Sequence, residues 1–227
     1  MLSAIAIVPS APVMVPELGA GTGAELADLR EAVAAAVGSL PQRWIAVGIG
    51  PADGVVGPDR TGTFAGYGVD LRVTLSPDAH AAPSELPLCA LIAGWLRGEA
   101  VGSARVEVRV HAQGLDVDDA LARGGRLRAE IDAAAELVGV LVVADGANTL
   151  TQPAPGGYDP DSIPVQAALD DALAGGDTAA LARLDDAIVG RAAYQVLAGL
   201  TGAPRSAKEL YRGAPYGVGY FVGVWQP

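Results

Sequence analysis

Asp145 and its neighbours carry the side chains best suited to acid–base chemistry or ligand binding. Asp145 directly follows the apolar run Val138–Ala144, so its carboxyl group lies at the edge of a predicted core, where partial burial raises a carboxyl pKa. An acid in that position is a candidate general base or ligand-binding group. The alternative is an Asx turn, in which Asp145 accepts hydrogen bonds from the backbone amides of Ala147 or Asn148. Asn148 itself and Thr149 are predicted to hydrogen-bond a polar substrate.

A second polar loop follows the first apolar run of the chain. It holds Ser10 within a segment that Pro9, Pro12 and Pro16 make stiff and extended. Ser10 comes just after a predicted strand, where a side chain can face a crevice. The alternative is a rigid crossover in which the Ser10 hydroxyl caps the backbone. Glu17 is equally consistent with a site acid and with a solvated acid at a helix entry.

Histidine and cysteine are scarce. The two histidines are His80, in a proline-flanked loop, and His111, at the end of an alternating strand. A site with two histidines and one carboxylate would require both to converge. Their contexts predict instead that each is solvent-exposed or paired. Cys89 lies in an apolar stretch without a neighbouring histidine, which favours a buried core thiol over a nucleophile.

Familiar catalytic motifs are missing from the sequence. There is no P-loop pattern, no nucleophile elbow and no zinc-type spacing of cysteine and histidine. The run Gly19–Gly23 weakly resembles a dinucleotide-binding loop, but its glycine spacing is wrong and it lies well past the strand end.

Composition limits the classes of partner. The formal net charge is −11 and no run of basic residues occurs, which argues against nucleic-acid binding. No uncharged apolar run reaches the ~20 residues of a membrane helix, so no membrane partner is expected. A single cysteine cannot form an intrachain disulfide, and the apolar N-terminus is interpreted as a strand rather than a signal peptide. We therefore predict a cytoplasmic protein whose partner is a small molecule.

The predicted strands are of two kinds. Continuous apolar runs predict strands buried on both faces, as in a parallel sheet: Ser3–Val8, Arg43–Ile49 and Val138–Ala144. Val69–Leu75 and Arg105–His111 alternate apolar and polar residues, which favours edge or antiparallel strands. Gly217–Trp225 is predicted to be the last strand, and Gly50–Gly68 a long irregular loop.

Helical patterns separate these strands. The predicted helices are Ala24–Val37, opened by Gly21–Gly23, then Leu86–Arg97, Asp118–Leu137, and two or three helices between residues 162 and 200. The alternation predicts an α/β fold, a three-layer αβα sandwich around a mixed, mainly parallel sheet, in one domain over residues 1–227. Ligands bind outside the carboxyl ends of such strands. The loops expected there are Pro9–Gly23, Gly50–Gly68 and Asp145–Gly157.

Three segments together resemble a known family. Val8–Gly19 (VPSAPVMVPELG) resembles the His-Pro-Pro opening of class III extradiol ring-cleavage dioxygenase catalytic (B) subunits. Ala144–Leu150 (ADGANTL), followed by Ala154–Asp159 (APGGYD), resembles their Gly-Asp-x-Ser-His-x-Leu segment and its proline-glycine continuation. Ala214–Tyr220 (APYGVGY) resembles the end of the chain in a group of actinobacterial homologues without an assigned activity. The resemblance spans the whole chain.

The resemblance implies an Fe(II) site that this chain lacks the residues to form. Members of the family hold non-haem Fe(II) with two histidines and a glutamate, and further histidines act on the catechol substrate. Position by position, these histidines fall on or near Ser10, Ala52, Gln113 and Asn148. Glu17 and Glu209 are the nearest matches to the glutamate ligand. Since serine and asparagine are poor Fe(II) ligands and alanine is none, the resemblance does not carry the activity with it.

These observations predict a protein with an extradiol-dioxygenase-like fold that has lost its Fe(II) site, uses no cofactor and binds a small molecule. The predicted ligand-binding residues suit a neutral polar ligand or a cation: Ser10, Asp53, Gln113, Asp145, Asn148 and Thr149. One alternative is a metal-free enzyme with Asp145 as base. Another is a ring-cleavage dioxygenase with unusual ligands such as His80 and His111. A further alternative is an interaction role, as a homo-oligomer with the aromatic C-terminal strand at a dimer edge, although core packing of that strand is favoured over the edge.

Overall fold

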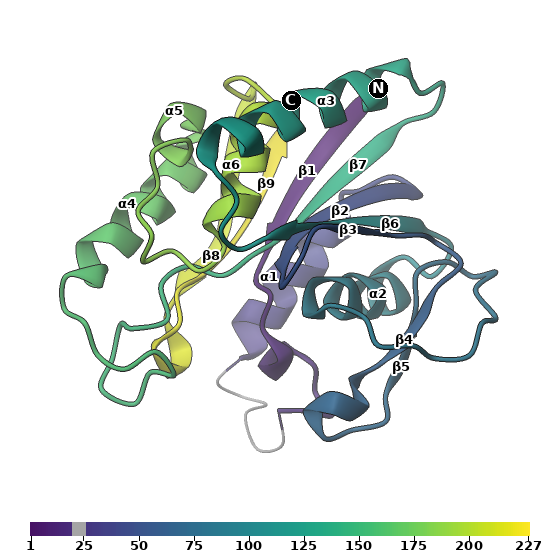
Figure 1. Ribbon diagram of the computed structural model, residues 1–227, viewed down its shortest axis with the longest axis horizontal. Helices are drawn as coiled ribbons and strands as arrows, with labels where there is room; N and C mark the ends of the chain where they lie inside the picture. Colours follow the sequence, from purple (N-terminus) through teal and green to yellow (C-terminus); the bar gives the residue numbers. More distant parts are fainter. Residues whose placement is uncertain (20–25) are drawn as a thin grey trace.

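A mixed seven-stranded sheet forms the centre of the protein (Figure 1). The computed structural model describes residues 1–19 and 26–227. The strand order is β3-β6-β2-β7-β1-β9-β8. These strands are β1 (Leu2–Val8), β2 (Arg43–Gly50), β3 (Gly54–Val56), β6 (Arg105–Ala112), β7 (Val138–Val143), β8 (Ser206–Gly213) and β9 (Tyr220–Gln226). The four middle strands β6, β2, β7 and β1 run parallel, whereas β3 and β9 pair antiparallel at their flanks and β8 pairs antiparallel with β9.

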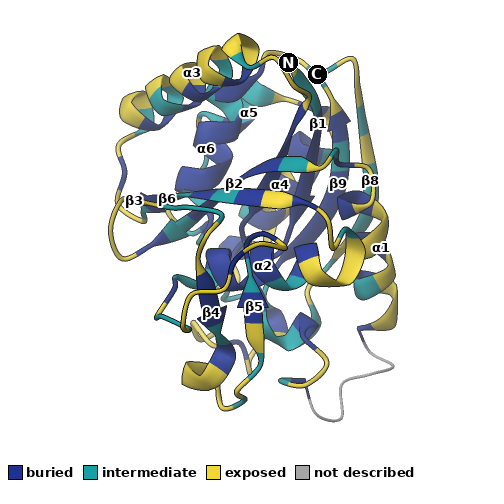
Figure 2. Cartoon of the chain, turned by 90° about the vertical axis from the view of Figure 1, so that its right-hand side faces the viewer, coloured by how far each residue is buried: buried dark blue, intermediate teal, exposed yellow. Residues whose placement is uncertain are grey.

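Helices cover both faces of this sheet and form two separate cores. The helices are α1 (Ala27–Val37), α2 (Leu88–Ala100), α3 (Val117–Ala133), α4 (Ser162–Gly175), α5 (Thr178–Leu181) and α6 (Arg191–Leu200). Side chains of β1 alternate between the cores: Ala6 packs with α1 and α2, and Ile7 packs with α3, α4 and α6. Figure 2 shows the buried strands between helices whose outer faces are exposed. The predicted three-layer sandwich with a mixed, mainly parallel sheet is confirmed.

Close packing of helix on strand explains the place of the cysteine. The side chain of Cys89 on α2 lies directly over Gly48 of β2, where any Cβ would overlap it. Cys89 is fully buried, and this burial raises the pKa of its thiol to about 12. The prediction of a buried core thiol is therefore confirmed.

Helices α3 and α6 are in backbone contact. A Cβ at Gly124 of α3 would overlap the carbonyl oxygen of Val196, and a Cβ at Gly199 of α6 would overlap that of Leu121. Both positions therefore exclude any larger residue. This contact fixes α3 against α6, which itself packs on β2, β7 and β6.

The segment after β2 is more ordered than predicted. Gly50–Gly68 was expected to be an irregular loop, but it contains β3, β4 (Thr61–Thr63) and a 3₁₀ turn, η2 (Phe64–Tyr67). The strand expected over Val69–Leu75 is shorter, β5 (Arg72–Thr74), and pairs with β4 in a separate two-stranded sheet. Glycine and proline obscured these strands because each is only three residues long.

Strand β6 was wrongly predicted to be an edge or antiparallel strand. It pairs parallel with β2 along its whole length, and only β3 lies antiparallel on its outer side. Its alternation has another cause, because Glu107 and Arg109 form ion pairs beside α3 on one face. Strand β8 was missed altogether, since its polar sequence SAKELYRG belongs to an outermost, half-exposed strand.

The C-terminal strand is internal. Strand β9 lies between β1 and β8, and its side chains Tyr220, Phe221 and Trp225 are buried. The suggested dimer edge at this strand is therefore wrong. The glycines Gly21–Gly23, predicted to open the first helix, lie outside the described residues. None of the described helices is long and apolar enough to cross a membrane.

Candidate functional site

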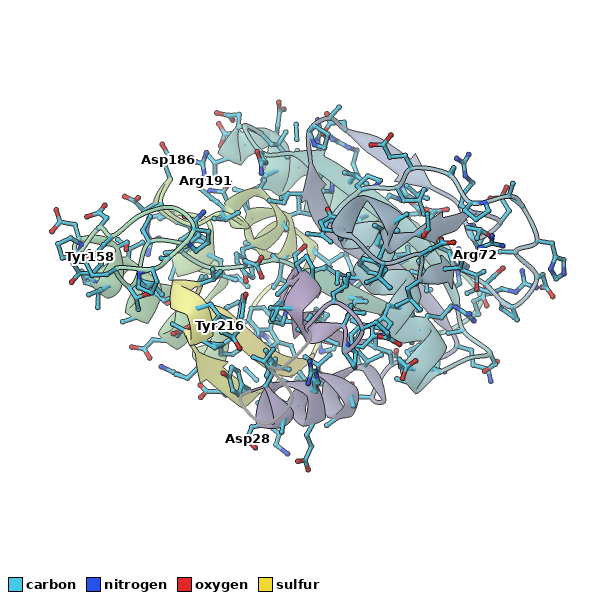
Figure 3. The ribbon with its side chains drawn as sticks, turned by 90° about the horizontal axis from the view of Figure 1, so that it is seen from below. Asp28, Arg72, Tyr158, Asp186, Arg191 and Tyr216 are labelled. Atoms are coloured by element: carbon cyan, nitrogen blue, oxygen red, sulfur yellow. The ribbon has the colours of Figure 1, made fainter. Side chains whose placement is uncertain are left out.

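A cavity opens where the four parallel strands end. Its volume is about 600 Å³, and it is lined by Ser10 after β1, Pro51 after β2, Gln113 after β6 and Asp145 after β7. We call it the carboxyl-edge crevice. This is the edge at which doubly wound sheets bind ligands. Figure 3 views the molecule from this side and places Arg72 and Tyr158 at its two opposite ends.

Asp145 is held by one hydrogen bond to its side chain and one to its backbone. Its Oδ1 accepts a hydrogen bond of 2.8 Å from the backbone N–H of Ser10. The backbone carbonyl of Asp145 accepts another from the N–H of Gly190, at 2.9 Å. Burial raises the pKa of the Asp145 carboxyl to about 7, although the Ser10 N–H opposes this shift. Oδ2 has no hydrogen-bond partner among the described residues.

The loop after Asp145 is fixed by a buried polar pair. The amide oxygen of Gln166 accepts from the N–H of Ala147 at 2.8 Å, and its nitrogen donates to Asp170 at 2.8 Å. The alternative of an Asx turn from Asp145 onto Ala147 or Asn148 is therefore wrong, because Gln166 of α4 takes the Ala147 N–H and the Asp145 side chain accepts from Ser10 instead. Tyr194 adds a hydrogen bond of 2.9 Å to the carbonyl of Ala144, so β7 ends in a rigid position.

The crevice presents hydrogen-bond acceptors and apolar walls. Ser10 is only 8% exposed, yet its hydroxyl has no partner within the part of the chain that the structure describes. Gln113 and Glu85 are exposed at the crevice. The apolar lining consists of Ile49, Leu86, Leu88 and Val189. Tyr67 of η2 also lines the crevice with a half-exposed ring.

Two predicted site residues do not line the crevice. Asn148 packs against Gly156, whose N–H donates to the Asn148 carbonyl at 2.9 Å. The hydroxyl of Thr149 donates to that of Ser162 at 2.8 Å. Both residues therefore hold the segment between β7 and α4. Glu85 and Val189 were not predicted, because they reach the crevice from connections outside the three expected loops. Tyr67 was not singled out either, although it lies in the Gly50–Gly68 loop that was expected at this edge.

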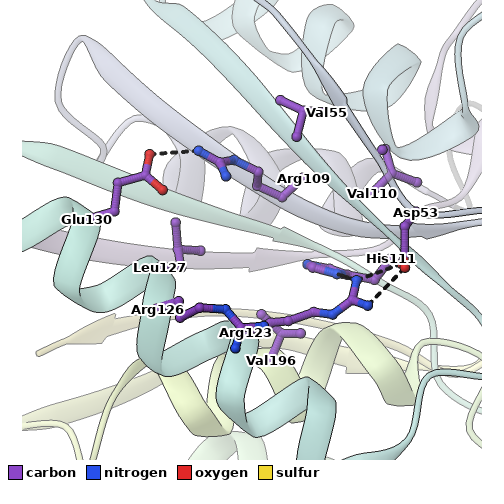
Figure 4. A pocket seen from close by; sticks show the side chains of 11 residues that line it. Asp53, Val55, Arg109, Val110, His111, Arg123, Arg126, Leu127, Glu130 and Val196 are labelled. Atoms are coloured by element: carbon purple, nitrogen blue, oxygen red, sulfur yellow. Dashed lines mark hydrogen bonds and ion pairs between the residues drawn. The ribbon is translucent and has the colours of Figure 1, made fainter.

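Asp53 also lies elsewhere, in a side cavity of about 550 Å³ between β6 and α3 (Figure 4). Its carboxylate forms an ion pair with Arg123 at 2.7 Å and accepts from the N–H of Ala112 at 2.9 Å. The hydrogen bond from Arg123 contributes most to lowering its pKa to about 2. Asp53 therefore ties the segment after β2 to β6 and α3.

His111 is buried beside this ion pair. Its Nδ1 lies 3.4 Å from Nη1 of Arg123, and a guanidinium can only donate, so Nδ1 is the acceptor and Nε2 carries the proton. Burial, reinforced by the Arg123 charge, lowers the pKa of His111 to about 4. His80 is exposed and does not line the crevice. Within residues 1–19 and 26–227, no three histidine, cysteine or acidic side chains form a metal-sized cluster.

The pKa of His111 predicts a loss of stability in acid. A histidine whose folded-state pKa lies below its unfolded value of about 6.5 favours unfolding as the pH falls from 6.5 towards 4. We expect His111→Gln to remove about 2 kcal/mol of this pH dependence. Urea denaturation at pH values across that range measures it. Equal slopes for the variant and the original protein would contradict the prediction.

The donor set does not fit the Fe(II) centre that the family resemblance implies. Of the matched positions, Ser10 and Gln113 line the crevice and supply a hydroxyl and an amide. Glu17 does not line it, and Glu209 pairs with Arg212 on β8. The carboxylates Asp145 and Glu85 remain, without the imidazoles that an Fe(II) site of this kind uses.

Fold and crevice together define an α/β three-layer sandwich with a ligand-sized cavity at the carboxyl edge of its sheet. No known family model matches the chain, and no curated protein matches it in sequence. Among solved structures it is similar to the uncharacterized protein JW3007 from Escherichia coli K12, with a TM-score of 0.58 and 10% identity. The match covers 99% of this chain and 100% of that chain. At this identity the likeness concerns the fold alone.

Proposed function

We propose that the protein binds a small molecule in the carboxyl-edge crevice without Fe(II), on a fold related to that of the class III extradiol dioxygenases. The observation that carries this proposal is the convergence of Ser10, Gln113 and Asp145 from three separate loops on one cavity. Ser10 and Asp145 come from two of the loops in which the sequence predicts function, and Gln113 comes from the segment after β6.

The physical character of the crevice supports binding. Cavities of roughly 300–1,000 Å³ with apolar walls and a few fixed polar groups are typical small-molecule sites. Here Asp145 is positioned by the Ser10 N–H, so little ordering of the site is needed when a ligand binds. The proposal includes a cytoplasmic location and the interpretation of residues 1–227 as one domain. A homo-oligomer stays a prediction.

A second candidate function is catalysis with Asp145 as general acid or base. The pKa of about 7 favours it, because a catalytic group works best when its pKa lies near the operating pH. Under this candidate, Asp145→Asn abolishes turnover of a bound ligand while binding persists. Under the binding proposal, the same change alters affinity alone.

A blocked-crevice variant tests the binding proposal. Val189 lines the crevice, so Val189→Trp is expected to fill it and to abolish the binding of fragments that the original protein binds. Ligand-observed NMR with a fragment library measures the effect, and a loss of more than about tenfold in affinity is expected.

The matched control places a tryptophan at the side cavity instead of the carboxyl-edge crevice. Val55 is 61% exposed and lines the side cavity beside Asp53, so Val55→Trp should leave fragment binding unchanged. Circular dichroism and thermal unfolding verify that both variants fold. Fragments that still bind to a folded Val189→Trp variant with the original affinity would refute the proposed site.

A further inference from the structure

We infer that the crevice selects a small molecule with a cationic amino group, which Asp145 and Ser10 hold while the apolar body lies along the crevice walls. The inference rests on the proposed function and specifies the charge and shape of the ligand.

The charges at the crevice favour a cation. The ionisable side chains that line it are Asp145, Glu85 and Tyr67, and no lysine, arginine or histidine of the described chain joins them. Glu85 forms no ion pair with any described residue. An anionic ligand would therefore meet two carboxylates without a compensating positive charge, and water would screen the repulsion poorly at Asp145, which is the poorly solvated one of the two. A cation would supply the counter-charge that the Asp145 carboxylate lacks.

The hydrogen-bonding groups of the crevice also favour a cationic ligand. Asp145 Oδ2 and the nearly buried Ser10 hydroxyl oxygen are both free to accept, and Gln113 adds an amide oxygen at the rim. An ammonium group has three N–H donors and no acceptor, so it matches such a set. Charge-assisted hydrogen bonds of this type are about twice as strong as neutral ones.

The remainder of the lining fits an apolar or aromatic body. Ile49, Leu86 and Val189 provide aliphatic walls that gain from covering apolar ligand surface. Tyr67 presents a half-exposed ring at the same cavity, and aromatic faces attract cations as well as flat apolar groups. We therefore expect a primary amine on a small ring or short hydrocarbon.

Matched amines and alcohols test the inference. The probes are benzylamine, 2-phenylethylamine and cyclohexylmethylamine, each compared by calorimetry and NMR with the alcohol of the same skeleton. At a pH above about 8, where Asp145 is ionised, we expect at least one amine to bind at least tenfold more tightly than its alcohol. Asp145→Asn should remove this preference, and Glu85→Gln should weaken it.

The control removes one negative charge from a residue outside the crevice. Glu99 is exposed on α2, so Glu99→Gln should preserve the preference for amines. Equal binding of amines and alcohols, binding of no amine at millimolar concentration, or an amine preference that survives in Asp145→Asn would each overturn the inference. If neutral fragments still bind and Val189→Trp blocks them, the inference fails while the proposed function stands. If nothing binds in the crevice, both fail.

Discussion

Asp145→Asn is expected to stabilise the protein above neutral pH by about 2–4 kcal/mol. Folding raises the pKa of this carboxyl from about 4 to about 7, so the folded state binds the proton more tightly than the unfolded chain. That contribution to stability is complete below pH 4 and is lost as the pH rises through 7. Asparagine carries no charge at any pH, and its amide oxygen can still accept from the Ser10 N–H.

Urea denaturation at intervals between about pH 4 and pH 8 measures this effect. Asp53→Asn is the matched control, and its effect on stability should have the opposite sign. Because the Arg123 ion pair lowers the Asp53 pKa, removing the Asp53 charge should destabilise the protein at neutral pH. If Asp145→Asn were no more stable than the original protein at pH 8, the carboxyl would not be held in a poorly solvated site. Ligand-binding sites commonly retain functional groups that reduce the stability of the fold.

Gly124→Ala is expected to destabilise the protein by about 3 kcal/mol or more. The new Cβ would overlap the Val196 carbonyl oxygen, which belongs to the backbone and cannot rotate away. Helices α3 and α6 would have to separate, which would open the core beneath them. Chemical denaturation monitored by circular dichroism measures the loss.

The adjacent residue provides the control. A Cβ at Gly125 would lie 3.9 Å from the nearest atom, so Gly125→Ala meets no obstacle. Because alanine favours helices over glycine by about 1 kcal/mol, this variant should be slightly more stable than the original protein. Similar effects of the two substitutions would show that α3 and α6 are not in backbone contact.

The sequence allowed the centre of the fold to be predicted but not its flanks. Strands β1, β2 and β7 are buried on both faces, so their sequences are continuous apolar runs that local pattern reveals. Strands β3 and β8 lie at the two edges of the sheet, where one side of the strand has no partner and the burial pattern is weak. Strand β6 alternates because it faces ion pairs with α3, which no local pattern distinguishes from an edge.

The candidate site was predictable only where it depends on strand ends. Ser10 and Asp145 follow strands that were predicted to be parallel, and parallel strands bring such residues to one edge. Gln113 was predicted only from the family resemblance, because β6 was not predicted to be parallel. Asn148 and Thr149 were placed there on sequence proximity to Asp145, but their side chains hold the next segment instead. Asp53 forms an ion pair with Arg123 at the side cavity instead of lining the crevice. Tyr67 and Glu85 line the crevice from connections whose path depends on tertiary packing.

The crystal structure of protein purified from iron-supplemented cells, with an anomalous difference map recorded at the iron edge, tests the central proposal most directly. We predict electron density for an organic molecule within hydrogen-bond distance of Asp145 and Ser10, and no anomalous peak in the crevice. An iron peak coordinated there by protein side chains would contradict the proposal that this crevice binds its ligand without a metal.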